Sequence, residues 1–88
     1  MGRYLKMARE HAKQIKYYYD NAGPLGHQQA VHYFNELSSL AGRASRSKND
    51  KSDVMHILPL GKSARVQISE MEKRRDEWIG ANEGDKIT

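Results

Sequence analysis

Residues 15–26, IKYYYDNAGPLG, place three consecutive tyrosines directly before a segment with two glycines and a proline. Consecutive residues of an α-helix point about 100° apart, so three neighbouring side chains cannot all face one core. Proline lacks the backbone N–H that a helix interior needs, and glycine favours the conformation found just after a helix C-terminus. The stretch therefore predicts a helix that ends near Asp20, followed by a reversal of the chain over residues 21–26.

The sequence before the reversal fits an amphipathic helix over residues 3–20. One sector of its helical wheel is predominantly apolar and contains Tyr4, Leu5, Met7, Ala8, His11, Ala12, Ile15, Tyr18 and Tyr19. The opposite sector is basic, with a repeat at i+3 and i+4 formed by Arg3, Lys6, Arg9, Lys13 and Lys16. Tyr17 projects into the basic sector, so the sequence assigns it to the surface and assigns Tyr18 and Tyr19 to the packing face.

Residues 27–44 predict a second helix by the same periodicity. Its apolar face consists of Ala30, Tyr33, Phe34, Leu37, Leu40, Ala41 and Ala44. A connection of about six residues between two helices favours an antiparallel pair. The first structural expectation is therefore an antiparallel helical pair formed by residues 3–20 and 27–44.

The rest of the chain is less regular. Residues 43–53 are rich in Ser, Asn, Asp and Lys, which is typical of a solvated, mobile loop. Two β-prone runs at 54–58 and 65–68 flank Pro59 and Gly61 and favour a short β-hairpin over residues 54–68. The competing interpretation is a helix that begins near Ser63, with apolar residues at helical spacing.

A third helix is expected over residues 69–80, because Ser69–Glu72 (SEME) matches a capping box. This helix is expected to pack back on the pair through Met71, Trp78 and Ile79, and residues 81–88 are expected to form a flexible tail. The predicted fold class is mainly α, with one small domain over residues 1–80. Two long amphipathic helices with a broad apolar sector make a homodimer plausible.

Composition limits the function. The 88 residues contain no cysteine, which excludes disulfides, thiol nucleophiles and cysteine-ligated zinc. No apolar run approaches the roughly 18 residues that a membrane span needs, and the N-terminal sequence lacks the apolar region of a signal peptide. We therefore expect a cytoplasmic protein that does not bind membranes.

The sequence offers no constellation for catalysis. The four histidines, at positions 11, 27, 32 and 56, lack metal-ligand spacing, and no glycine-rich phosphate loop or paired carboxylates in an apolar setting are present. A nucleophilic tyrosine would need several converging Arg or His side chains, or a metal, around a pocket. We expect a protein that is not an enzyme and that needs no metal or cofactor.

Basic residues are the most specific functional signal. The net charge is +4, from 15 basic and 11 acidic residues, and the basic sector of the first helix can follow a phosphate backbone. The hypothesis is a small non-catalytic regulator that docks on nucleic acid or a nucleoprotein complex. The alternative is an inhibitor or adaptor that blocks a protein interface of a larger machine. The candidate binding residues are Arg3, Lys6, Arg9, Lys13, Lys16, Tyr17, Arg43, Arg46, Lys48 and Lys51.

Overall fold

A computed structural model describes residues 2–21 and 26–87, with side chains described as far as residue 77. Within these ranges the chain forms three α-helices, namely α1 (Arg3–Asn21), α2 (His27–Arg46) and α3 (Val54–Ile87). A short 3-10 helix, η2 (Lys51–Asp53), leads directly into α3. The expectation of a mainly helical fold is confirmed. None of the helices in the described ranges combines the length and the apolar character that a membrane crossing requires.

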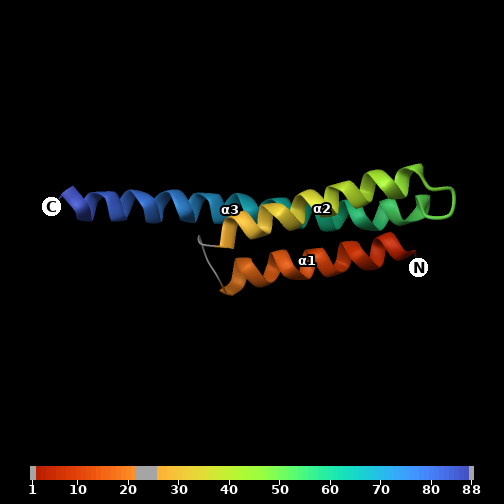
Figure 1. The fold of residues 1–88 in the computed structure, drawn as a ribbon, viewed down its shortest axis with the longest axis horizontal. Coiled ribbons are helices and arrows are strands. Elements are labelled where there is room, and N and C mark those ends of the chain that lie inside the picture. Colours follow the sequence, from red (N-terminus) through yellow and green to blue (C-terminus); the bar gives the residue numbers. More distant parts are fainter. Residues whose placement is uncertain (1, 22–25, 88) are drawn as a thin grey trace.

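The helices lie side by side as an elongated bundle of 60 × 19 × 15 Å. α1 and α2 run in opposite directions, and α3 runs in the same direction as α1 (Figure 1). Each helix packs against the other two. α3 is the longest helix, and its C-terminal part extends well past the end of the α1–α2 pair (Figure 1).

The core is a stripe of small and branched side chains along the axis of the bundle. The largest side chains that are fully buried are those of Ile15, Leu37, Ile57 and Met71. All three helices contribute, because the apolar residues of each recur every three or four positions. The remaining buried apolar residues are Leu5, Ala8, Ala30, Leu40, Ala44, Ala64 and Ile68.

The predicted β-hairpin at 54–68 is wrong, because α3 is continuous through this segment. Pro59 and Gly61 favour a turn locally, but the burial of Ile57, Ala64 and Ile68 at helical spacing outweighs them. Pro59 removes one helical hydrogen bond, to the carbonyl of Met55. Pro59 and Met55 are both exposed, so water can satisfy that carbonyl.

The predicted start of a helix at Ser69 is also wrong, since Ser69–Glu72 lies inside α3. The carboxylates assigned to a capping box instead join α3 to the other helices. Glu70 accepts a hydrogen bond from the Tyr19 hydroxyl of α1. Glu72 lies 3.0 Å from the imidazole of His27, at the start of α2.

The segment 43–53 contains more helix than expected. α2 continues to Arg46, and η2 begins at Lys51, so only residues 47–50 lie between helices. The turn is held by hydrogen bonds from Ser47 Oγ to Asp50 and from the Asp53 N–H to the Asp50 carbonyl. The mobility of this segment and of residues 81–88 stays a prediction, although α3 is helical to Ile87.

Met71 is buried, as expected for the third helix. The expected packing of Trp78 and Ile79 lies outside the side chains that the structure describes.

Asp53 is the buried charge among the described side chains, with 5% of its surface exposed. Its Oδ1 accepts a 3.4 Å hydrogen bond from the Gly2 N–H, and its Oδ2 has no partner within the described part of the chain. The N-termini of α1 and α3 both lie at this end of the bundle (Figure 1). Their positive helix dipoles favour a carboxylate there.

Residue 2 is under a steric constraint at this carboxylate. A Cβ atom there would overlap Oδ2 of Asp53 and lie 2.6 Å from Oδ1 of Asp50. By contrast, a Cβ on Gly42, near the C-terminus of α2, would meet only the guanidinium of Arg46 at 3.8 Å. The two glycines therefore differ in what an added methyl group would displace.

We expect Gly2→Ala to lower the free energy of unfolding by about 1–3 kcal/mol, because the buried Asp53 carboxylate must move and lose its partner. Gly42→Ala is the matched control and should raise it by up to about 1 kcal/mol, since alanine is the better helix former. Urea denaturation of the two variants measures both effects. Equal effects of the two substitutions would contradict the role of Gly2.

Tyr19 provides a second test of how α1 and α3 are held together. Its hydrogen bond to Glu70 raises the pKa of the Tyr19 hydroxyl above its ordinary value of 10.0, and the Arg74 guanidinium lies 4.8 Å from the centre of its ring. Since the pKa is higher in the folded state, this stabilisation is present in full below pH 10 and is lost as the pH rises through the folded-state pKa.

Tyr19→Phe keeps the ring and removes the hydroxyl. We expect the wild-type chain to be more stable than the variant by a constant amount at neutral pH and by a shrinking amount above pH 10. Chemical denaturation of both proteins between neutral and strongly alkaline pH measures the difference. A stability difference that grows above pH 10 would show that the hydroxyl does not donate to Glu70 in solution.

Candidate functional site

The positions of the three helices along the bundle axis decide which basic residues lie at the same end of the molecule. Gly2 contacts Asp53, and Tyr19 contacts Glu70, so each residue of α1 lies level with the residue of α3 that is 51 positions later. His27 of α2 lies level with Glu72 of α3. The start of α1, the end of α2 and the start of α3 therefore lie at one end of the bundle (Figure 1).

This arrangement places two groups of basic residues that are distant in the sequence at the same end of the bundle. The first turns of α1 carry one group, and the last turns of α2 with the following connection carry the other. All of these side chains are exposed. Lys62, in the third turn of α3, is exposed as well. We call this part of the bundle the basic end, and its basic residues are Arg3, Lys6, Arg9, Arg43, Arg46, Lys48, Lys51 and Lys62.

Charge is distributed unevenly along the bundle. The half that contains the basic end, residues 2–11 and 37–62, has these eight basic residues and three acidic residues. The other half, residues 12–21, 26–36 and 63–77, has six of each. The three acidic residues near the basic end are all engaged, because Asp53 is buried, Asp50 accepts a hydrogen bond from Ser47 Oγ and Glu10 lies 3.9 Å from Lys13.

Helix dipoles add to this potential. The N-termini of α1 and α3, which carry partial positive charge, both point toward the basic end. The opposing partial negative charge of the α2 C-terminus is offset by Arg43 and Arg46 in its last turn. The N-termini of α1 and α3 and the basic side chains therefore act in the same direction, and the C-terminus of α2 opposes them.

Part of the α1 surface is shaped as a shallow hollow of about 370 Å³. The first three basic residues of α1 line it together with Gly2, Glu10 and Lys13. The guanidinium of Arg3 lies 4.9 Å from the centre of the Tyr4 ring and donates a 3.2 Å hydrogen bond to the Tyr4 hydroxyl. The Tyr4 ring thus contacts one of the cations that line the hollow.

The other predicted binding residues lie farther along α1. Lys13 and Lys16 are exposed, but Lys16 forms a 2.7 Å ion pair with Asp20. The hydrogen bond from Lys16 to Asp20 raises the pKa of the Lys16 ammonium. Lys13 still lines the hollow that the first three basic residues of α1 form, whereas Lys16 lies a turn farther along α1, toward its C-terminus.

The three tyrosines occupy the positions that the sequence predicts. Tyr17 is 57% exposed, whereas Tyr18 and Tyr19 are partly buried. The Tyr18 ring stacks on Tyr33 of α2, with centroids 6.2 Å apart, and the Tyr17 ring contacts Tyr18 edge-on at 5.5 Å. Tyr17 thus lies away from the basic end, at the opposite end of α1.

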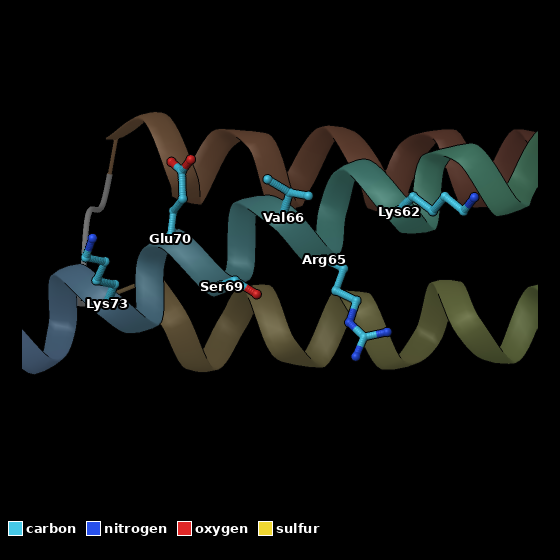
Figure 2. Close-up of a pocket in the computed structure, with 6 residues that line it drawn as sticks. All are labelled: Lys62, Arg65, Val66, Ser69, Glu70 and Lys73. Carbon is cyan, nitrogen blue, oxygen red and sulfur yellow. The ribbon is translucent and has the colours of Figure 1, made fainter.

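Sequence reasoning missed Lys62 and Arg65 of α3, and it left Lys73 out of the binding residues because neighbouring carboxylates offset its charge. Lys62, Arg65 and Lys73 line a shallow hollow of about 610 Å³ on the outer face of this helix, around the exposed Val66 (Figure 2). The hairpin interpretation concealed this face. Helical spacing of the three basic residues was the signal that would have revealed it.

The described side chains offer no metal site. Groups of three or more His, Cys, Asp or Glu close enough to hold an ion are absent among them. His11 packs against the Tyr33 ring at 5.7 Å, and His27 contacts Glu72. Both histidines thus make contacts between helices.

Comparison of the chain with protein-family models, curated proteins and solved structures found no match.

The division of the tyrosines can be tested by truncation. Tyr17→Ala should change the free energy of unfolding by less than about 0.5 kcal/mol, because an exposed side chain contributes little to stability. Tyr18→Ala should lower it by about 1–3 kcal/mol, because the variant loses the packing against Tyr33. Thermal or urea denaturation measures both, and a larger effect at Tyr17 would contradict the observed phase of α1.

Proposed function

We propose that this chain is a small non-catalytic regulator that binds nucleic acid, alone or within a nucleoprotein complex, through the basic end. The observation that carries this proposal is the convergence of basic residues from α1, from α2 and from the connection after α2 on one end of the bundle. A row of basic residues on one helix is common on soluble proteins. Convergence of separate segments with an excess of five positive charges is a more specific feature.

The chemistry of the basic end suits a phosphate backbone. Its arginines can form paired hydrogen bonds with phosphate oxygens, and its lysines supply point charges. The cations are spread over three segments of the chain instead of a single deep pocket. This spread favours an extended polyanion over a small phosphorylated molecule.

The binding should be insensitive to base sequence. No helix presents a row of Asn, Gln and Arg side chains of the kind that reads base edges within the described part of the basic end. Contacts with the backbone position a protein on nucleic acid but carry no sequence information. The proposed role is therefore attachment to a nucleic acid or to a complex that exposes one.

A second candidate function is an inhibitor or adaptor that occupies a protein interface. It is favoured by three large apolar side chains that stay exposed on α3, namely Met55 (77%), Leu58 (55%) and Val66 (60%). Exposed apolar residues that share one helix are typical of a protein-binding face. The experiment below distinguishes the candidates, because this face should respond little to reversal of charges at the basic end.

The test is a pair of charge reversals that change the net charge equally. Arg43→Glu with Lys48→Glu alters the basic end, and Lys73→Glu with Arg75→Glu alters exposed positions on the more neutral half. We expect the first variant to bind a fluorescent DNA duplex or RNA single strand at least about 10-fold more weakly, and the second to bind within about threefold of wild type.

Fluorescence anisotropy at about 50 and about 200 mM salt measures these affinities, and affinity should fall steeply over this range because bound phosphates release counterions. Equal losses in the two variants would indicate attraction by net charge alone. Absence of binding by the wild-type chain at about 50 mM salt would overturn the proposal in favour of a protein partner.

A further inference from the structure

A groove with an apolar floor lies on the surface between α2 and α3. Its volume is about 290 Å³, and α1 contributes none of the described residues that line it. Leu37 and Ile57 in its lining are buried, whereas Leu58 on its α3 wall is 55% exposed. We call this site the α2–α3 groove, and its apolar lining residues are Phe34, Leu37, Ala41, Ile57 and Leu58.

The α3 wall of the groove contains a residue without a side chain. A Cβ atom on Gly61 would lie 3.5 Å from Leu37, which is an ordinary contact, so packing within the described chain does not require a glycine there. Glycine also destabilises a helix interior, as Pro59 does two residues earlier. Such departures from local preference are expected at functional sites. A glycine at this position leaves room for a partner to approach the backbone of α3.

The charge at the α2–α3 groove is positive. Lys62 and Arg65 line it, and none of its described lining residues is acidic. Neither cation forms an ion pair or a hydrogen bond with another side chain in the described part of the molecule. An apolar surface with unpaired cations at its edge is complementary to a ligand that combines apolar groups with carboxylates.

The next carboxylates along α3 do not neutralise these cations. Glu70 points toward α1, whereas Arg65 points toward α2 (Figure 2). Glu72 lies 3.0 Å from the imidazole of His27 and is engaged there. The charges of Lys62 and Arg65 are therefore available to a partner.

We propose that the α2–α3 groove binds an acidic amphipathic helix of a partner protein. The apolar residues of that helix enter the groove, and its carboxylates pair with Lys62 and Arg65. This inference gives the second candidate function a site and a partner chemistry. It does not depend on nucleic-acid binding at the basic end.

The shape of the groove favours a helix as its occupant. Its α2 wall spans residues 34–41, which is about 10 Å at 1.5 Å per residue, or two helical turns. Apolar residues at positions i, i+4 and i+7 of a partner helix span the same length, and such a helix lays its apolar face into a groove of this kind. Acidic residues that flank this face would then lie beside Lys62 and Arg65.

A protein suits the groove better than nucleic acid does. A phosphate backbone can pair with Lys62 and Arg65, but it has no apolar side chains to cover Phe34 and Leu58. A partner helix removes these apolar surfaces from water and pairs with the cations at the same time. Small molecules occupy pockets of about 300–1,000 Å³, so the groove lies at the lower limit of size for them.

Two peptides that differ only in charge test the proposal. Each is a fluorescently labelled helical peptide of about 18 residues, with leucines at positions i, i+4 and i+7. The flanking positions carry glutamate in one peptide and lysine in the other. Fluorescence anisotropy with the full chain, in the absence of nucleic acid, measures both affinities. We expect the glutamate peptide to bind at least about 10-fold more tightly, because only its charge complements the groove.

Three variants of the chain locate the binding. Lys62→Glu with Arg65→Glu reverses the charge at the groove, and Gly61→Gln fills the groove with an uncharged residue that favours helix. Both should weaken binding of the glutamate peptide at least about 10-fold. Arg43→Glu with Lys48→Glu changes the net charge as much as the first variant, outside the groove, and should bind within about threefold of wild type. Circular dichroism verifies that each variant is folded.

Equal affinities for the two peptides, no binding of the glutamate peptide at about 1 mM, or equal losses in the two charge-reversed variants would each overturn the proposal. Sedimentation equilibrium tests for a second copy, because a wild-type dimer that Gly61→Gln converts to a monomer would assign the groove to self-association instead. Loss of duplex DNA binding in Gly61→Gln with unchanged peptide binding would assign it to nucleic acid. Since the peptides are measured without nucleic acid, failure of this proposal is distinguishable from failure of binding at the basic end.

Discussion

The parallel placement of α3 beside α1 is the constraint on which the rest of the structure depends. Two contacts fix it, one at each end of α1, through Gly2 with Asp53 and Tyr19 with Glu70. With α3 at this position along the bundle axis, Ile57 and Met71 are buried against the α1–α2 pair. It also sets which charges share one end and how much of α3 extends past its neighbours.

Asp53 shows how this placement accommodates an unfavourable group. A buried carboxylate loses the hydration of its charge, and here one of its oxygens has no partner among the described residues. The N-termini of two helices offset part of that loss, because their unpaired N–H groups and dipoles favour negative charge. The carboxylate in turn restricts residue 2 to glycine, so the start of the chain and the start of α3 are coupled sterically.

The first two helices could be predicted from the sequence because their apolar residues recur so regularly that local and long-range preferences agree. The segment 54–68 could not, since Pro59 and Gly61 give strong local signals for a turn. The burial of Ile57, Ala64 and Ile68 acts only after the α1–α2 pair has formed a surface. Tertiary packing outweighed local propensity there.

The candidate site was predictable in part for the same reason. Exposure of the basic residues on α1 follows from its periodicity, and the assignment of Tyr17 to the surface follows from the same wheel. Which of those residues lie at the same end of the bundle as Arg43 and Lys48 depends on the connectivity of the helices and on their positions along the bundle axis, which no local pattern encodes. Lys62 was missed because its segment was interpreted as a hairpin.

The uneven charge of this 60 Å bundle also has a kinetic consequence. A particle with an excess of positive charge at one end rotates in the field of a polyanion before contact, so encounters with that end first are enriched over random collisions. End-on attachment would leave the long axis standing away from the surface. The C-terminal turns of α3 would then lie away from the polyanion, at a distance set by the length of the bundle.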